Sequence, residues 1–236
     1  MNDRPVAASP RMYRGRKPGW FYALVRKIWQ AVFSCTIRVE MHGLGNLPAE
    51  GGVIIAVVHS SHLDPLVVST LLRRKIAWMS RIEFYQSVVS RKFLQGIGAF
   101  AVNRQNPGLA PIRESARRLA AGDVVGIFPE GEIRNGGVSV CRGGGIKAGT
   151  MYLSALTGCP VVPVLVLGSA SLSGVGPWLP ALRGRIWLRV GQPVRADRGE
   201  RDRAGRAAAS AGLAECFRTM FREGQAEWNP PEDAFP

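Results

Sequence analysis

The feature that most constrains the fold is an alternation between short apolar runs and longer stretches with helical periodicity. Several of the apolar runs contain no polar residue, as is typical of strands that helices cover on both faces. Strands that alternate with helices favour an α/β fold, and we predict a single domain with a central, partly parallel sheet flanked by helices. The expected strands are Gly52–Val58, Ile76–Ser80, Phe100–Val102, Val124–Phe128, Val161–Leu167 and Ile186–Val190, and the expected helices are Pro65–Leu72, Glu83–Leu94, Pro111–Ala121, Lys147–Leu156 and Asp202–Arg222.

The two ends of the chain differ in composition from this alternating region. Residues 1–19 are polar and basic, with prolines at positions 5, 10 and 18, and we expect a basic flexible arm. Residues 226–236 are rich in proline and acidic side chains and are expected to form a flexible tail. Residues 38–225 then form the one folded domain, a size that is ordinary for a single core.

Residues 20–37, WFYALVRKIWQAVFSCTI, form the most membrane-like segment. Arg26 and Lys27 interrupt it, and it is shorter than the ~20 clean apolar residues of a spanning helix. As a helix it places one broad apolar face opposite its polar residues, which favours an amphipathic helix at a membrane interface over a helix that only packs on the core. The members of that face are Phe21, Leu24, Val25, Ile28, Trp29, Val32 and Phe33.

The charge balance narrows the partners. Lys and Arg number 31 against 17 Asp and Glu, a net charge of +14, which attracts polyanions such as anionic lipid, phosphorylated substrates or nucleic acid. No nucleic-acid-binding motif accompanies the basic residues, so we predict no nucleic-acid partner. The four cysteines, at positions 35, 141, 159 and 216, form no CxxC pair, which favours a reducing, cytosolic setting over a disulfide framework.

A candidate catalytic pair follows the first apolar run directly. Residues 59–65 read HSSHLDP, so His59 begins at the strand end and Asp64 stands five positions later, before Pro65. Pro65 suits the first turn of a helix, and we predict Asp64 as its N-cap. A short loop lets the Asp64 carboxylate hold one ring nitrogen of His59, which leaves the other free to take a proton from a hydroxyl.

Two other interpretations of this segment remain open. Asp64 can be a helix cap alone, with His59 an ordinary loop histidine. Together with His62 the pair can also bind a metal, but the spacing matches no common metal motif, so we predict no metal site.

The motif His59-x4-Asp64 after an apolar strand resembles the HX4D block of the glycerolipid acyltransferase family, whose best-known members acylate glycerol-3-phosphate or lysophosphatidic acid. Three further blocks follow in the family's order. Residues 98–104, GAFAVNR, resemble the second block, residues 128–131, FPEG, the third, and residues 159–163, CPVVP, the fourth. The similarity extends over about residues 38–195.

The resemblance implies the chemistry and the roles of the site residues. A fatty acyl group moves from acyl-coenzyme A or acyl-carrier protein to a hydroxyl of a 1-acylglycerol-3-phosphate-like lipid, in phospholipid biosynthesis. His59 is then the general base, oriented by Asp64, and no cofactor is needed because the thioester is already activated. Arg104, Glu130 and Gly131 match the family positions that contact the phosphorylated acceptor. A peripheral, monotopic location on the cytoplasmic face of the membrane is expected.

One departure from the family pattern concerns the acceptor. The family usually continues FPEG with Thr-Arg-Ser, whereas this chain has Glu132, Ile133 and Arg134. Either Arg134 takes the place of the missing cation, or Arg104, Arg142 and Lys147 bind the phosphate. The third possibility is another membrane acceptor, such as a glycolipid or a lyso-aminolipid. The rival from a different class is a non-catalytic basic protein that binds membranes or nucleic acid.

Overall fold

The computed structural model describes residues 19–102, 109–172, 184–197 and 202–236. One sheet of seven strands lies at the centre, in the order β1-β7-β6-β2-β5-β3-β4, and every neighbouring pair is parallel except β6 and β7. The strands are β1 (Ile37–His42), β2 (Val53–Val57), β3 (Ile76–Arg81), β4 (Phe100–Val102), β5 (Val124–Ile127), β6 (Val161–Leu167) and β7 (Gly184–Val190). The predicted α/β class with a partly parallel sheet is confirmed.

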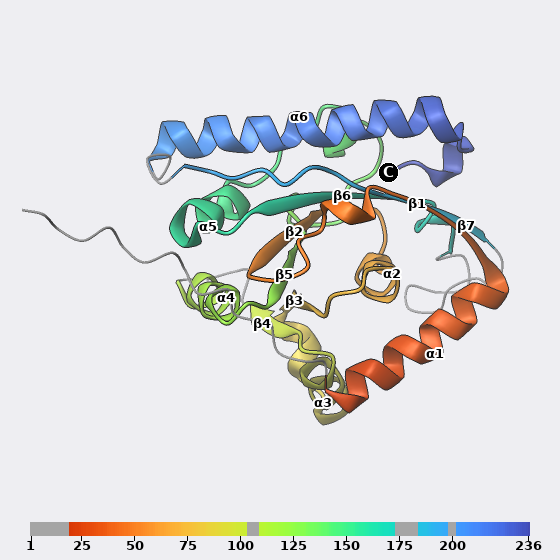
Figure 1. Ribbon diagram of the computed structural model, residues 1–236, viewed down its shortest axis with the longest axis horizontal. Helices are drawn as coiled ribbons and strands as arrows, with labels where there is room; N and C mark the ends of the chain where they lie inside the picture. The colour runs from red at the N-terminus through yellow and green to blue at the C-terminus, as the bar shows by residue number, and fades with distance from the viewer. Residues whose placement is uncertain (1–18, 103–108, 173–183, 198–201) are drawn as a thin grey trace, which may run out of the picture.

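Helices cover both faces of this sheet (Figure 1). One face carries α4 (Ala110–Ala120), α5 (Gly149–Thr157) and α6 (Arg203–Trp228), and the other carries α1 (Trp20–Thr36), α2 (Asp64–Leu71) and α3 (Val88–Gly96). All of β2 is buried, since Ile54 and Ala56 pack with the first group and Ile55 and Val57 with the second. This double coverage explains why β2 contains no polar residue.

Two elements differ from the sequence prediction. Strand β1 was not predicted, because it is an edge strand that pairs only with β7 and keeps polar side chains on its exposed positions. The single helix expected over residues 83–94 is instead a short 3-10 turn, Ile82–Tyr85, followed by α3. The chain is extended at Ser87, and that break separates the two elements.

The C-terminal segment is packed rather than flexible, which corrects the prediction for residues 226–236. Helix α6 continues to Trp228, Ala234 is buried, and the Phe235 ring packs edge-on against Phe221 at 5.4 Å. The Gly168 N–H also donates to the Ala234 carbonyl at 2.8 Å. These apolar side chains cover the α6 face of the sheet. The prolines that follow α6 therefore end the helix, but the segment after them still packs on the core.

Helix α1 has its apolar residues on more than one face, unlike the single face that its sequence predicts. Phe33 is buried and Trp29 is half-buried, whereas Trp20, Leu24 and Ile28 are 78%, 48% and 52% exposed. The buried side anchors α1 to α2 and the sheet, so part of the apolar face is core and part faces outward. Among the described residues no helix is long and apolar enough to cross a membrane.

Candidate active site

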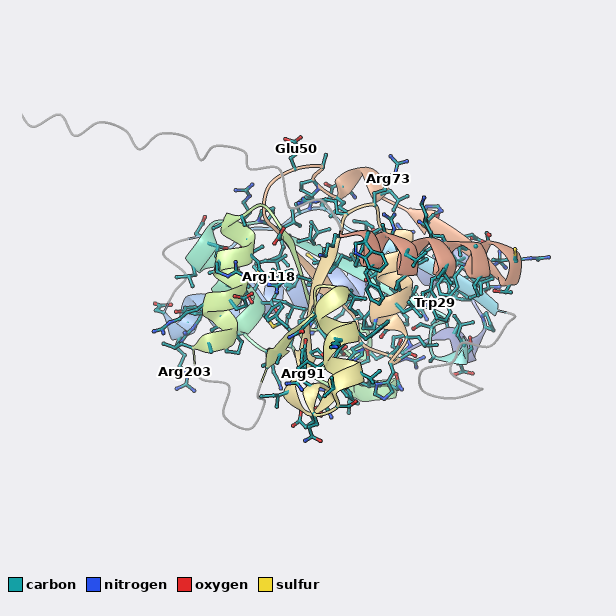
Figure 2. All side chains as sticks on the ribbon, turned by 90° about the horizontal axis from the view of Figure 1, so that it is seen from below. Trp29, Glu50, Arg73, Arg91, Arg118 and Arg203 are labelled. Atoms are coloured by element: carbon teal, nitrogen blue, oxygen red, sulfur yellow. The ribbon has the colours of Figure 1, made fainter. Side chains whose placement is uncertain are left out.

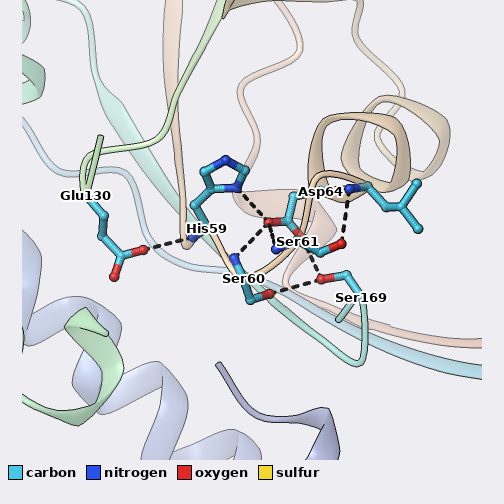
Figure 3. Close-up of polar contacts among 7 residues, drawn as sticks. His59, Ser60, Ser61, Asp64, Glu130 and Ser169 are labelled. Atoms are coloured by element: carbon cyan, nitrogen blue, oxygen red, sulfur yellow. Dashed lines mark hydrogen bonds and ion pairs between the residues drawn. The ribbon is translucent and has the colours of Figure 1, made fainter. Parts of the chain in front are cut away.

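The predicted catalytic pair lies at the carboxyl end of β2, where open α/β sheets place their ligands. His59 Nδ1 is 2.9 Å from Asp64 Oδ2, and both residues are buried. Because an ionised carboxylate can only accept, the ring proton lies on Nδ1 and Nε2 is left as the basic nitrogen. Nε2 is on the side of the ring away from Asp64 and bonds to no described residue (Figure 3).

Asp64 is the first residue of α2, and Leu63 is the N-cap, which corrects the predicted cap. Its carboxylate instead closes the preceding loop, since Oδ2 also accepts from the backbone N–H groups of Ser60 and Ser61, each at 2.9 Å. The loop residues 59–61 are therefore fixed by the same oxygen that holds the imidazole. This arrangement combines the catalytic and the structural interpretations of Asp64.

Ser169 is a further polar residue of this site, and the sequence analysis missed it. Its hydroxyl donates to Asp64 Oδ1 at 2.5 Å and lies 3.1 Å from the Ser60 hydroxyl (Figure 3). The available signal was its position, since a polar residue follows the buried strand β6 at the same edge of the sheet.

Glu130, the family match for a contact with the acceptor, is held by backbone groups at both of its carboxylate oxygens. The side chain is completely buried, Oε2 accepts from the His59 N–H at 2.9 Å, and Oε1 accepts from the Val140 N–H at 2.8 Å. Burial raises the pKa of Glu130 above its ordinary value, although the two N–H donors oppose that shift. Glu130 therefore joins the loop after β5 to the loop after β2.

The FPEG loop also packs directly on His59. The Phe128 ring stacks on the imidazole with centroids 3.9 Å apart, and Trp78 stacks on the other face of Phe128 at 5.0 Å. The Arg134 N–H donates to the His59 carbonyl at 2.9 Å. Backbone and ring of His59 are thus both held by residues 128–134, which limits the imidazole to one orientation.

The predicted acceptor-binding residues fall into three groups. Gly131 adopts a positive φ of 81°, and a side chain there would collide with Lys147, so Lys147 lies against the FPEG loop. The Arg134 guanidinium pairs with Glu132 at 3.0 Å and contacts the Gly145 carbonyl at 3.3 Å. Arg104 lies outside the described residues.

A cleft of about 910 Å³ adjoins this centre, between α1, α2, α3 and β3. His59, Glu132 and Ile133 contribute to its lining, so the cleft reaches the imidazole. His62 lines it too, and burial lowers the pKa of His62, which favours its neutral form. Its apolar lining includes Val25, Trp29, Leu66, Trp78, Phe93, Leu94 and Ile97.

Other kinds of catalytic group are less well placed. Burial raises the pKa of the Cys141 thiol to about 12, so this thiol stays protonated and is a poor nucleophile. The Ser60 hydroxyl is buried against Ser169. In the part of the chain that the structure describes, no cluster of His, Cys, Asp and Glu has the makings of a metal site.

Comparison with known proteins identifies the class to which this centre belongs. The profile of the Acyltransferase family matches residues 38–167, more than half of the chain. The 1-acyl-sn-glycerol-3-phosphate acyltransferase of Bacillus subtilis is 28% identical over 174 residues, which are 73% of this chain and 82% of that enzyme. The chloroplastic enzyme of the same name from Arabidopsis thaliana is 22% identical over 185 residues, 76% of this chain but 50% of the plant protein.

A solved acyltransferase structure has the same fold as this chain. The crystal structure of the 1-acyl-sn-glycerophosphate acyltransferase from Thermotoga maritima matches with a TM-score of 0.70 at 20% identity, over 88% of this chain and 80% of that chain. With the matching family profile, this chain belongs to the acyltransferase family. It is an enzyme similar to the 1-acylglycerol-3-phosphate O-acyltransferases, as its four sequence blocks predicted.

Proposed function

We propose that this enzyme transfers a fatty acyl group from acyl-coenzyme A or acyl-carrier protein to the hydroxyl of a 1-acyl-sn-glycerol-3-phosphate-like lipid, in phospholipid biosynthesis. The observation that carries the proposal is the buried His59–Asp64 pair, which leaves Nε2 free on a residue that lines an apolar cleft. Nε2 takes the proton of the acceptor hydroxyl as its oxygen attacks the thioester carbonyl. The carbon–sulfur bond then breaks, and the leaving thiolate receives the proton from the imidazolium.

The apolar cleft is suited to the fatty chain of a substrate. Aromatic and aliphatic side chains from α1, α2 and α3 line it, and its volume of about 910 Å³ is near the upper end of the usual range for ligand pockets. An acyl chain in this cleft brings its carboxyl end toward His59, because the imidazole is part of the lining. Proximity of the two reactants then contributes to the rate without any covalent acyl-enzyme.

The phosphate of the acceptor is assigned to the cations around the FPEG loop. Arg134 and Lys147 both lie beside this loop, and Arg104 is the family match for a third cation. The pairing of Arg134 with Glu132 reduces the charge offered to a phosphate. This pairing and the apolar Ile133 favour the alternative acceptor, a glycolipid or lyso-aminolipid, as the second candidate.

An anionic membrane surface is the proposed location, with the chain peripheral and on the cytoplasmic face. Many large apolar side chains that are exposed lie on three adjacent elements, the outer side of α1, the 3-10 turn after β3, and α3. They are Trp20, Leu24, Ile28, Ile82, Phe84, Val88, Val89 and Phe93. The charged residues of α1 and α3 are all basic, as Arg91 illustrates in Figure 2, so this surface offers both apolar area and positive charge.

The experiment that tests the acyl transfer is an acceptor screen with one labelled acyl-coenzyme A. We expect transfer to lysophosphatidate, and Arg134→Ala is expected to raise its KM about tenfold, the cost of one charge-assisted bond. Arg222→Ala is the matched control, because that guanidinium pairs with Glu215 at 2.8 Å on α6, which covers the other face of the sheet. A phosphate-free lyso-lipid that is the better substrate of the unmutated enzyme would overturn the phosphate acceptor in favour of the alternative.

A further inference from the structure

Ser169 is the residue of this centre that no sequence block accounts for. It is fully buried, it comes 105 positions after Asp64, and its hydroxyl is bonded to the Asp64 oxygen that His59 does not use. We propose that Ser169 is a positioning residue of the reaction, which fixes the Asp64 carboxylate so that its other oxygen holds the imidazole. This inference rests on the proposed role of His59 as the base.

The fold places Ser169 with little freedom. Strands β2 and β6 are parallel neighbours, paired from Ile54 with Val161 to Val57 with Val164, so their carboxyl ends reach the same edge. Gly168 turns the chain there with a φ of 84°, and a side chain at this position would collide with the Arg185 carbonyl. The Gly168 N–H is held by the Ala234 carbonyl at 2.8 Å. The C-terminal segment thus helps to fix the turn at Gly168 through this hydrogen bond.

The direction of the hydrogen bonds follows from the donors available. An ionised Asp64 only accepts, so the one hydroxyl proton of Ser169 points to Oδ1. The Ser60 hydroxyl, 3.1 Å from Ser169 Oγ, must then donate to it. Two hydroxyls therefore point in series toward the carboxylate, which strengthens each bond. Ser60 is therefore a hydrogen-bond donor in the series Ser60–Ser169–Asp64, and we do not assign it as a nucleophile.

The two carboxylate oxygens are supported very unequally. Oδ2 accepts from His59 and from two backbone N–H groups, whereas Ser169 is the donor to Oδ1 among the described residues. A buried charge without its donor is costly, so the loss of this hydroxyl is expected to rotate the carboxylate or to draw in water. Either response changes the bond between Oδ2 and the imidazole. The Ser169 hydroxyl therefore acts on the base through Asp64.

The test compares Ser169→Ala, Ser169→Cys and Ser169→Thr with the unmutated enzyme. We expect Ser169→Ala to lower kcat by about 10- to 100-fold, the equivalent of one hydrogen bond to a charged group, with an acceptor KM within about twofold. Thr keeps the hydroxyl and should restore most of kcat. Cys keeps the volume but is a weak donor, so its kcat should be close to that of Ala. Ser115→Ala is the control, since Ser115 is equally buried and donates to the Pro111 carbonyl within α4.

A spectroscopic readout in the free enzyme makes the test independent of substrate choice. The Nδ1–H proton shared with Asp64 should give a low-field NMR resonance that disappears in His59→Ala, moves in Ser169→Ala and Ser169→Cys, and returns in Ser169→Thr. An unmoved resonance and an unchanged kcat in Ser169→Ala would overturn the positioning role. If Ser169→Ala does not fold, the same two readouts on Ser169→Cys decide. An active His59→Ala would instead overturn the proposed function itself.

Discussion

The proposed catalytic loops, residues 59–64, 128–134 and 168–169, meet the walls of the cleft at His59, and the two regions are built in opposite ways. Around Asp64, backbone groups and side chains from three distant segments converge, and every bond is between buried partners. The cleft is lined mostly by apolar side chains, and two of them, Phe84 and Phe93, are 38% and 45% exposed. Directional bonds fix one geometry, whereas apolar packing tolerates changes of shape.

This contrast indicates how the two regions can change independently. A substitution in the catalytic loops leaves a buried polar group without its partner, and the reaction suffers directly. A substitution inside the cleft alters its volume, which affects the choice of acyl chain. A substitution on the outer side of its walls alters the exposed apolar area, which affects binding to a membrane.

The largest effect is expected at the base. His59→Ala should lower kcat by about 10² to 10⁴-fold, the usual contribution of a general base, and Asp64→Ala nearly as much. His42→Ala is the matched control, because that imidazole lies on β1 and pairs with Glu227 of α6 at 3.0 Å. Turnover by His59→Ala at a rate close to that of His42→Ala would contradict the role of His59 as the base.

The next effect concerns the outer side of the cleft walls. Replacing Trp20, Leu24 and Ile28 by Gln should weaken binding to anionic vesicles by at least about tenfold, since three apolar side chains leave the interface. Added salt should weaken it further, because screening reduces the attraction of the basic residues. Phe21 is excluded from the set, since its ring packs on Phe93 at 6.0 Å.

The control for the membrane prediction lies on the opposite face of the sheet. Leu156 on α5 is also an exposed apolar residue, so Leu156→Gln removes one apolar side chain from the face of the sheet that α1 does not cover. Co-sedimentation with vesicles measures both variants. If the triple variant and Leu156→Gln bind alike, the outer side of α1 is not the membrane contact.

A smaller effect is expected inside the cleft. Leu94 is half-buried on α3 and lines the cleft, so Leu94→Trp fills part of its volume. We expect kcat/KM for long acyl chains to fall several-fold relative to short ones, because about 1 kcal/mol of overpacking is at stake. The hydrogen bonds of Asp64 are untouched, so the short-chain rate should stay near normal. An equal loss for all chain lengths would mean that the cleft does not hold the acyl chain.

The sequence predicted the buried strands and the contact between His59 and Asp64 well, for a local reason. Strand β2 is apolar throughout because both of its faces are covered, and His59 and Asp64 are five residues apart in one loop. The edge strand β1 has no such pattern, since one side pairs with β7 and its polar residues face solvent. Periodicity identifies elements by their burial, so a half-exposed edge strand escapes it.

Non-local contacts account for what the sequence did not reveal at the site. Ser169 reaches Asp64 only because β6 is the parallel neighbour of β2, an order of strands that the sequence alone does not specify. Glu130 matched a family position for the acceptor, but its burial depends on the Val140 N–H, which approaches from a separate turn. The sequence of the C-terminal segment is polar, but Trp228 and Ala234 are buried in the core between α6 and the sheet. In each case the deciding partner is remote in sequence.

The smallest effect concerns the cost of burying Glu130, whose pKa is raised by burial. A raised pKa means that the folded protein binds the proton more tightly than the unfolded chain. The ionised form therefore lowers stability at neutral pH, and this cost disappears as pH falls from the raised pKa toward the ordinary value of 4.5. The free energy of unfolding of the wild type relative to Glu130→Gln should thus rise on acidification.

Glu114 gives a reference of opposite sign, because its bonds to Arg117 and Arg118 lower its pKa to about 2. Relative to Glu114→Gln, the wild type should lose stability as pH falls from 4.5 toward 2, by an amount that solvent screening keeps small at this partly exposed site. Urea unfolding of the three proteins across these pH values measures both slopes. Slopes of the same sign would show that the two N–H donors outweigh burial at Glu130 and lower its pKa.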